Sequence, residues 1–378
     1  MSESDILAYL TDRQSAMVET LRAWVNHDSP TFNKAAVDQM GQTIAAAFAE
    51  TGAQIEVHPQ PELGDHYTLS WTYPEAIGQI LILGHFDTVW PDGEAIRRPF
   101  SIQDGRAMGP GVSDMKAGLL VACFAMEALQ RLNLTPKRNV AFLLNSDEEI
   151  GSLSSRDLIE AEARKSDFCL VVEPARQGAL TTWRKGVGRF VMKVRGLASH
   201  SGVDPEKGAS AIEELARQIV TLHGFTNLDI GTTVNVGVIS GGTRPNVIAA
   251  DAEAEIDLRV MTMAEGERMV AAILGLEAQD PRTTVTIEGG MNRPPFEETS
   301  AGQVLAQKAQ SIAEQLGFPT GTIGSGGGSD GNFASALGVP TLDGLGGVGA
   351  GSHALTEHTE IDFLPKRAAL LAELILSL

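Results

Sequence analysis

The feature that most constrains the fold is an alternation of helix and strand patterns that stops near residue 183 and resumes near residue 291. Before the break, helical segments such as SAMVETLRAWV alternate with short apolar runs such as AIGQILILG and RNVAFLLN. After it, AGQVLAQKAQSIAEQLG, GVPTLDGLG and PKRAALLAELILSL predict a helix, a short strand and a closing helix. Strands alternating with helices predict a mostly parallel sheet with helices on both faces, which is an α/β fold.

The segment between the two halves has a different order of patterns. GVGRFVMKVRG predicts a strand, PEKGASAIEELARQIVTLHG a helix, TTVNVGVISGG and DAEAEIDLRVM two strands, TMAEGERMVAAILGL a helix and TTVTIEGG a strand. The order β-α-β-β-α-β is that of a ferredoxin-like α+β unit. We therefore expect one domain at residues 1–182 and 291–378, interrupted by an inserted domain at residues 183–290.

Charge and composition exclude several classes of protein. The 29 basic and 48 acidic residues give a formal charge of −19 without any basic tract, which argues against nucleic-acid or membrane partners. The start, MSESDILAYLTDRQ, lacks a signal-peptide pattern, and no apolar run approaches the roughly 18 residues that span a bilayer. Cys123 and Cys169 lie in apolar contexts that predict buried thiols rather than a disulfide. We expect a cytoplasmic protein.

Acidic and histidine side chains gather where the predicted strands end. The carboxyl ends of parallel strands meet at one edge of a sheet, where ligands bind. Two histidines and several carboxylates without a thiolate form a ligand set that suits Zn²⁺, with Mn²⁺ or Co²⁺ as alternatives. A carboxylate two residues after a histidine is also placed to hold the second nitrogen of a metal-binding imidazole. The residues are His85, Asp87, Asp114, Glu148, Glu149, Glu173 and His353.

Each of these residues has a simpler explanation when taken alone. A histidine at a strand end is often a hydrogen-bonded core residue, an aspartate before a helix is a favoured N-cap, and a pair of glutamates is commonly a solvated loop. These alternatives apply to His85, to Asp114 and to Glu148 with Glu149, while Glu173 alone would be an ordinary loop acid and His353 a surface histidine. The coincidence of all of them at strand ends favours a metal site.

Seven motifs occur in order along the chain: GHFDTV, GPGVSDMKAG, NSDEEIGS, VVEPA, GLASHSG, GGGSDGNFA and SHALTEH. Together they resemble the M20 family of di-zinc peptidases and amidohydrolases, and most closely its glutamate carboxypeptidase branch. The resemblance covers essentially the whole chain. It implies a catalytic domain at residues 1–182 and 291–378, and a dimerisation or lid domain at residues 183–290 through which two copies would form a homodimer.

The resemblance also implies a role for each site residue. Asp114 would bridge two Zn²⁺ ions, with a cis peptide bond before Met115. His85 and Glu173 would complete one metal site, and Glu149 and His353 the other. The remaining residues would be catalytic: Asp87 orienting the first histidine, Glu148 as general base, and His200 in GLASHSG reaching the oxyanion, often from the partner subunit. The simpler explanation of His200 is a turn histidine.

Substrate-binding residues are expected on the inserted domain and at its junctions. Asn246 and Arg259 resemble family positions that contact the substrate carboxylate or the oxyanion region. Arg293 in MNRPPFE matches an arginine of the glutamate carboxypeptidase branch, and a guanidinium binds a carboxylate with two hydrogen bonds. Two alternatives stay open, a surface ion pair for Arg293 and the same binding role for Arg244.

Two loops need separate interpretation. GSGGGSDG lacks the lysine and threonine of a P-loop, so Gly327 and Gly328 are predicted to allow close approach of the substrate and Asp330 to cap the next turn. HALTEH departs from the family pattern after the last histidine, which leaves Glu357 or His358 as the residue that supports the metal ligand.

The expected function is zinc-dependent hydrolysis of an amide bond that releases a C-terminal amino acid, with glutamate as the leading example, from an N-acyl or peptidyl small-molecule substrate. The alternative within enzymes is an N-acyl amino-acid deacylase that uses the same site. A binding module that has lost turnover is disfavoured, because the general base Glu148 is present together with the metal ligands.

Overall fold

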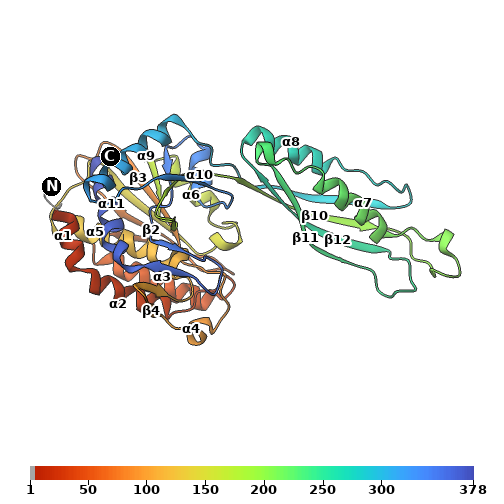
Figure 1. Ribbon diagram of the computed structural model, residues 1–378, viewed down its shortest axis with the longest axis horizontal. Coiled ribbons are helices and arrows are strands. Elements are labelled where there is room, and N and C mark those ends of the chain that lie inside the picture. Colours follow the sequence, from red (N-terminus) through yellow and green to blue (C-terminus); the bar gives the residue numbers. More distant parts are fainter. Residues whose placement is uncertain (1–4) are drawn as a thin grey trace. The chain divides into compact units, whose positions relative to one another are not determined.

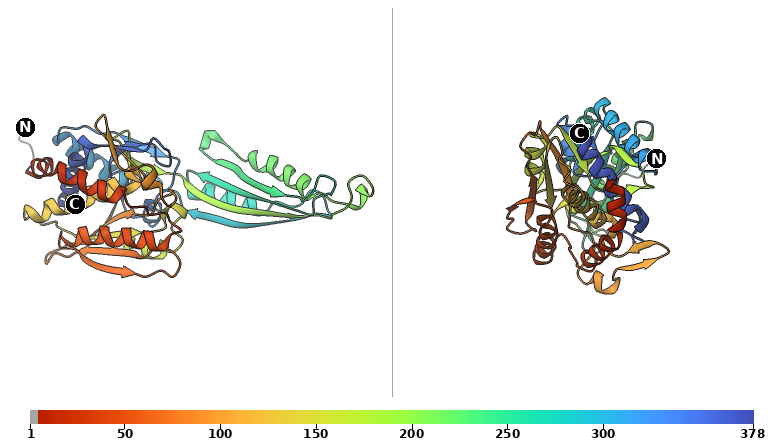
Figure 2. Two further views of the ribbon diagram at one scale, coloured as in Figure 1. Left: turned by 90° about the horizontal axis from the view of Figure 1, so that it is seen from below. Right: turned by 90° about the vertical axis from the view of Figure 1, so that its left-hand side faces the viewer.

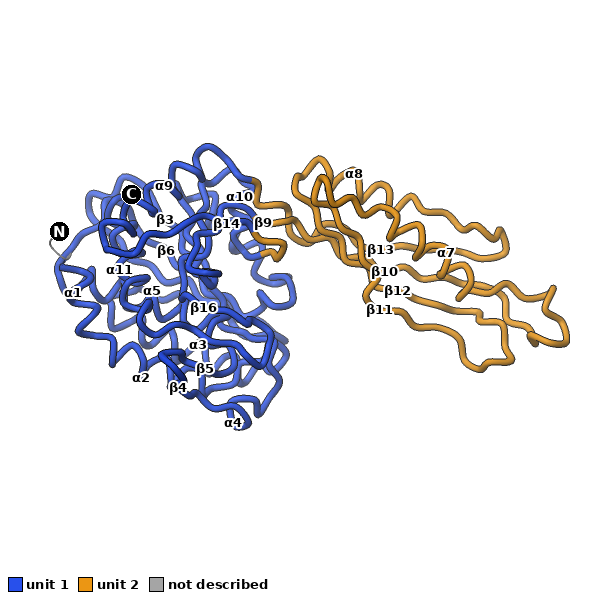
Figure 3. The backbone as a smooth tube through the Cα atoms, in the orientation of Figure 1, with its two compact units in different colours: residues 1–183, 298–324, 329–378 blue, residues 184–297, 325–328 orange. Residues whose placement is uncertain are grey.

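The computed structural model describes residues 5–378, so the first four residues of the segment MSESDILAYLTDRQ, on which the signal-peptide prediction rests, lie outside the described residues. The chain forms two compact units (Figure 3): the first contains residues 1–183, 298–324 and 329–378, and the second residues 184–297 and 325–328. The second unit therefore runs to residue 297, beyond the predicted 290, and also takes in the glycine-rich segment 325–328. Within the described residues, no helix has the length and apolarity needed to cross a membrane.

The first unit is built on a six-stranded sheet of order β1-β2-β6-β3-β7-β15. Strands β6, β3, β7 and β15 run parallel, whereas β1 and β2 are antiparallel additions at one edge. The sequence patterns had not predicted β2. The two central strands, β3 and β6, are almost entirely buried, as expected where helices cover a parallel sheet on both sides. The strands are β1 (Gln54–His58), β2 (His66–Trp71), β3 (Gln79–His85), β6 (Asn139–Asn145), β7 (Phe168–Val171) and β15 (Thr341–Leu342).

Helices cover both faces of this sheet (Figure 1), which confirms the predicted α/β class. Alternate residues of β3 point to opposite faces: Ile80 and Ile82 belong to one apolar cluster, Leu81 and Leu83 to another. The first cluster includes α1 (Asp5–Asp12), α2 (Gln14–Val25), α3 (Lys34–Ala49), α5 (Ala117–Arg131), α9 (Ser300–Gln315) and α11 (Leu364–Ser377). The second includes α6 (Arg156–Ala163) and α10 (Gly331–Ala336).

A smaller five-stranded sheet, of order β4-β5-β17-β16-β8, joins segments from both ends of the first unit. In its parallel pair of β16 and β8, Ala175 lies opposite Val348. This pairing brings the segment after Glu173 beside the segment that leads to His353. The strands are β4 (Ser101–Gln103), β5 (Arg106–Met108), β8 (Ala175–Arg176), β16 (Val348–Ala350) and β17 (His358–Glu360). The remaining elements are the short helix α4 (Glu94–Arg97) and a two-stranded sheet of β9 (Leu180–Arg184) and β14 (Thr322–Ser325).

The second unit has the β-α-β-β-α-β order that the sequence predicts. Its antiparallel sheet has the order β11-β12-β10-β13, and both helices lie on one face of that sheet (Figure 2). Side chains of both helices and of the sheet form one apolar cluster. Helix α7 begins later than its pattern suggested, because Ser210 accepts a hydrogen bond from the Glu213 amide as N-cap. The elements are β10 (Gly186–Arg195), α7 (Ala211–His223), β11 (Thr233–Gly241), β12 (Asp251–Val260), α8 (Met263–Leu274) and β13 (Thr284–Arg293).

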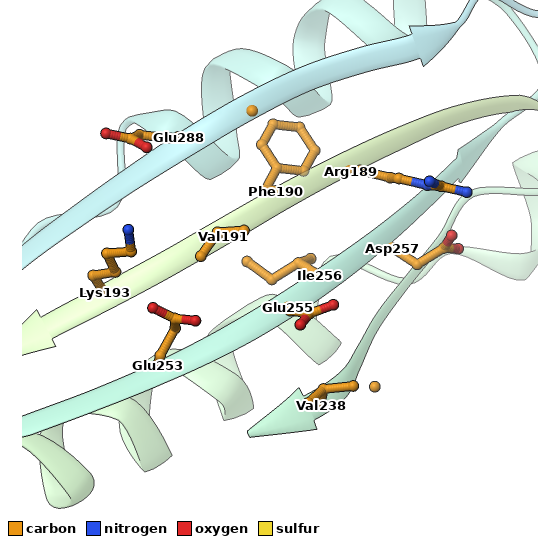
Figure 4. A pocket seen from close by; sticks show the side chains of 12 residues that line it. Arg189, Phe190, Val191, Lys193, Val238, Glu253, Glu255, Ile256, Asp257 and Glu288 are labelled. Atoms are coloured by element: carbon orange, nitrogen blue, oxygen red, sulfur yellow. The ribbon is translucent and has the colours of Figure 1, made fainter. Parts of the chain in front are cut away.

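The other face of this sheet carries charged side chains around a hollow of about 640 Å³ (Figure 4). Arg189 lies opposite Asp257 and Lys193 opposite Glu253 in the register of β10 and β12. Opposite charges paired across antiparallel strands contribute roughly 0.2–1 kcal/mol each. An antiparallel sheet with one apolar and one charged face is stable with the charged face in water.

Candidate active site

The site lies where β3, β6 and β7 end side by side. These strands are parallel neighbours, and His85 at the end of β3 is in register with Asn145 at the end of β6. The loops that follow therefore begin at the same edge of the sheet. They carry the predicted residues Asp87, Glu148, Glu149 and Glu173.

Asp114 lies between two histidines from opposite ends of the chain. Its Oδ1 atom is 3.3 Å from Nε2 of His85, and its Oδ2 atom is 3.4 Å from Nε2 of His353. The bond from Asp114 to Met115 is a cis peptide, as the resemblance implied. The two oxygens of one carboxylate thus face two different imidazoles.

A second carboxylate accompanies each histidine. Oε1 of Glu173 is 3.7 Å from Nε2 of His85, and Oε2 of Glu149 is 3.2 Å from Nε2 of His353. Two overlapping triplets have ligand atoms within 4.8 Å of one another: His85, Glu148 and Glu173, and His85, Asp114 and Glu149. The structure therefore brings together all of the predicted ligands and the predicted base, Glu148.

The electrostatics of this cluster favour a positive charge in its middle. Burial alone would lower the pKa of His85, but its contacts with Asp114 and Asp87 raise that pKa well above the usual value. Contacts with Asp114 and Glu149 raise the pKa of His353 to about 11. Burial raises the pKa of Glu149, whose Oε1 atom is buried without a hydrogen-bond partner. Divalent cations would replace the imidazole protons and satisfy this oxygen, so the residues fit metal ions.

Asp87 contacts both the first histidine and the turn that carries the glutamates. Its Oδ1 atom is 3.2 Å from Nδ1 of His85, and its carboxylate accepts hydrogen bonds from the amides of Glu148 and Glu149, both at 3.3 Å. Thr31 donates to Oδ2 at 2.8 Å. No sequence motif indicated Thr31, which lies 56 residues upstream of Asp87. Asp87 is therefore placed to fix the imidazole and the glutamate turn together.

Glu357, and not His358, supports the loop that carries Asp114. Its buried carboxylate accepts hydrogen bonds from the amides of Gly111, Ser113 and Asp114 at 2.9–3.0 Å and from the Trp90 indole at 2.9 Å. His358 instead faces the carbonyl oxygen of Thr356. Glu357, one of the two residues expected to support His353, thus holds the backbone of Asp114 instead.

Replacing Glu357 with alanine is expected to lower the free energy of unfolding by about 3 kcal/mol, because each buried donor without an acceptor costs about 1–3 kcal/mol. Metal affinity should fall about 10–100-fold, as is usual when a residue supporting a ligand is lost. Chemical denaturation and metal titration measure the two effects. Glu360→Gln, three residues further along the chain, is the control, because the partly exposed Glu360 pairs with Arg106 at 2.9 Å and lies 3.9 Å from His358. Equal behaviour of the two variants would contradict this role.

The predicted substrate residues of the second unit form two groups at opposite ends of its sheet. His200 forms an isolated bridge with Val247, next to Asn246, beyond the end of β10. Arg293 pairs with Val187 at the start of β10, and Arg259 also lies at this end, with Asp257 and the Gly326 carbonyl as partners. The exposed Arg244 has no part in the second group.

The glycine-rich loop differs from its prediction in one respect. A Cβ atom on Gly328 would lie 2.9 Å from Cδ of Arg293, so this glycine is approached closely by an arginine of the chain. Arg184, which the sequence did not single out, donates to the carbonyls of Gly327 and Gly328 at 3.3 and 3.5 Å. The expected capping by Asp330 is wrong: its side chain makes no cap hydrogen bond and instead contacts residues near the end of β6.

Comparisons with known proteins agree with this geometry. Residues 81–377 match the model of peptidase family M20/M25/M40. Carboxypeptidase G2 of Pseudomonas sp. (strain RS-16) is 29% identical over 382 residues, covering 97% of this chain and 90% of the relative. Succinyl-diaminopimelate desuccinylase of Dechloromonas aromatica (strain RCB) is 31% identical over 310 residues, covering 76% and 80%.

A solved structure supports the fold. The aminopeptidase PepT structure from Bacillus cereus ATCC 10987 superposes with a TM-score of 0.80 at 24% identity, covering 96% of this chain and 98% of that one. At this identity the likeness concerns the fold alone. The family match covers most of the chain and includes every residue of the clustered site. The chain belongs to peptidase family M20/M25/M40 and is an enzyme of the metallopeptidase and amidohydrolase type.

Proposed function

We propose that the protein binds two Zn²⁺ ions, with Co²⁺ or Mn²⁺ as alternatives, and hydrolyses an amide bond to release a C-terminal amino acid, with glutamate as the leading example. The observation that carries this proposal is the position of Asp114, whose two oxygens face His85 and His353. Each histidine has its own second carboxylate, Glu173 or Glu149. One carboxylate shared by two otherwise separate ligand sets is suited to a pair of ions.

The chemistry that a bound pair of divalent cations supplies is activation of water and polarisation of the amide carbonyl. Glu148 then acts as general base: it takes a proton from the attacking water and gives it to the leaving amine. Its place beside His85 and Glu173 supports this role. Asp87 keeps the imidazole of His85 oriented and holds the backbone of the glutamate turn.

Recognition of the substrate is assigned to the second unit. Arg293 binds the carboxylate of the released amino acid with two hydrogen bonds, with Arg259 as a further contact and Gly327 and Gly328 leaving room for the substrate backbone. Asn246, which lies beside His200 at the other end of the sheet, is assigned to the oxyanion region together with that histidine. The similarity to carboxypeptidase G2 supports a carboxypeptidase. The similarity to a desuccinylase supports the alternative, an N-acyl amino-acid deacylase on the same site.

A homodimer through the second unit accounts for the separation of its two groups of residues. His200 lies beyond the end of β10, whereas Arg293 pairs with Val187 at its start, and the eight residues of strand between Val187 and Arg195 span roughly 25 Å. One small substrate cannot contact both residues of the same subunit. We assign the oxyanion contact to His200 of a second copy, which makes residues 183–290 of the sequence prediction a dimerisation or lid domain.

The edge strand β11 provides a surface for this contact. Its last residues, 237–241, are exposed, and unpaired edge strands readily join those of another chain. Val238 and Ile239 on this edge are 54% and 63% exposed, and Val220 on the neighbouring helix α7 is 75% exposed. Apolar side chains in water beside an open strand edge favour association of two copies.

Placing charges on this edge is expected to separate the copies. The double variant Ile239→Lys with Val220→Glu should sediment as a monomer and lose kcat, because His200 no longer reaches the other active site. Analytical ultracentrifugation and steady-state kinetics measure both effects. Val304→Glu, at a valine of the first unit that is 65% exposed, is the matched control. A monomeric variant with full activity would contradict the assignment of His200.

Amino-acid release from a matched substrate panel tests the proposed function. The panel contains benzoyl-, folyl- and acetyl-capped glutamate with equally capped alanine and methionine, assayed with zinc and with a chelator. We expect chelator-sensitive release of glutamate from the large caps. A preference for acetyl caps and neutral residues would favour the deacylase, and no release from any substrate by the zinc-loaded protein would contradict the proposal.

A cytoplasmic location also belongs to this proposal, and the two free, buried cysteines support it.

A further inference from the structure

Asp330 is a buried carboxylate that the proposed reaction does not use. It precedes helix α10 and is 4% exposed, yet it does not cap that helix. Its Oδ2 atom accepts a hydrogen bond from Nδ2 of Asn145 at 2.7 Å, and its Oδ1 atom accepts one from the hydroxyl of Ser152. Both donors belong to a segment more than 170 residues away in sequence, separated from Asp330 by 185 and 178 positions.

These two donors enclose the turn that carries the catalytic glutamates. Asn145 is the last residue of β6, and Ser152 follows the 3₁₀ turn Glu148–Ile150. Ser152 has a positive φ of 56°, a left-handed conformation that costs a residue other than glycine about 1–2 kcal/mol. A hydrogen bond to a buried carboxylate offsets this cost. Asp330 therefore fixes both ends of the turn.

A second aspartate has a different effect on the same turn. Asp147 accepts hydrogen bonds from the amide and hydroxyl of Ser154 at 2.7 and 2.8 Å and from the hydroxyl of Ser155 at 2.6 Å. All of these donors lie within eight residues of Asp147. Local contacts of this kind fix the shape of the turn. A contact from a distant segment fixes where the turn lies against the sheet: Asp87 supplies one to the amides in the middle of the turn, and Asp330 supplies one to its two ends.

We propose that Asp330 is a positioning residue that fixes the turn bearing Glu148 and Glu149 by holding Asn145 and Ser152. The kinetic part of this inference rests on the proposed function. Misplacing a catalytic group by about 1 Å costs on the order of 10²-fold in rate. Loss of Asp330 should therefore act on turnover more than on substrate binding.

The test compares Asp330→Ala, Asp330→Asn and Ser152→Gly. We expect Asp330→Ala to lower kcat about 10–100-fold with KM changed less than about threefold, because the turn moves while the substrate contacts stay. Asp330→Asn, which can accept only one of the two hydrogen bonds, should be intermediate. Hydrogen–deuterium exchange of residues 146–155 should be faster in Asp330→Ala, whether or not any substrate is turned over.

Ser152→Gly removes one donor and also the backbone strain, so it keeps the inference testable if Asp330→Ala does not fold. It should lower kcat in the wild-type background and have no further effect in Asp330→Ala, because the hydroxyl acts through Asp330. The control is Glu162→Gln, another buried carboxylate, which accepts hydrogen bonds from Gln79 and Lys165 at the opposite end of β3. It should lower stability without changing kcat.

Unchanged kcat and unchanged exchange in Asp330→Ala would overturn the inference. So would additive effects of Ser152→Gly and Asp330→Ala, or an equal loss of kcat in Glu162→Gln. Failure of the wild-type protein to release any amino acid would count against the proposed function alone. In that case the exchange of residues 146–155 still decides whether Asp330 positions the turn.

Discussion

Replacing Glu148 with glutamine is expected to lower kcat about 10²–10⁴-fold, the usual contribution of a general base. The amide keeps the size of the side chain but cannot take a proton from water. Zinc content should stay the same, because the proposed ligands, among them His85, Asp114 and Glu173, are unchanged. Steady-state kinetics with metal analysis of the same sample measure both quantities.

Glu160→Gln is the matched control for this variant. Glu160 is an acid of the following helix α6, where it pairs with Arg156 and Arg164, and its replacement should leave kcat unchanged. Full activity in Glu148→Gln would mean that another group takes the proton. Loss of zinc from Glu148→Gln would mean that Glu148 is primarily a ligand.

Replacing Asp114 with alanine is expected to remove both metal ions and to lower kcat/KM at least about 10³-fold, because the Lewis-acid chemistry of the ions is worth several kcal/mol. A carboxylate that served one ion only would leave the other in place. Isothermal titration with zinc and elemental analysis count the ions that remain. We expect fewer than one per chain in the variant and two in the wild type.

Asp157→Ala, at an exposed aspartate in the first turn of α6, controls for loss of a negative charge in Asp114→Ala. It should bind zinc as the wild type does. Retention of one tightly bound zinc by Asp114→Ala would show that the carboxylate does not bridge. The histidine and carboxylate pairs on its two sides would then be independent sites.

The sequence predicted the location of this site because strand ends are easy to recognise. Apolar runs such as those of β3 and β6 end abruptly in polar residues, and parallel neighbours bring those ends together. The same reasoning predicted the β-α-β-β-α-β order of the second unit. Both predictions needed only the spacing of apolar residues within single short segments of the sequence.

The supporting contacts were not predictable in this way. Thr31 donates to Asp87 from 56 residues upstream, and Glu357 holds amides more than 240 residues away. Asp330 looked like a helix cap because aspartate before a short helix usually is one. Its donors become visible only when β6 and α10 are packed together, which no local pattern reveals.

Anomalous diffraction at the zinc absorption edge determines whether two metal ions share Asp114. Crystals of the zinc-loaded protein are expected to show two peaks per chain: one between Oδ1 of Asp114 and His85, the other between Oδ2 and His353. A single peak, or two peaks of which one does not contact Asp114, would show that this carboxylate does not bridge two ions.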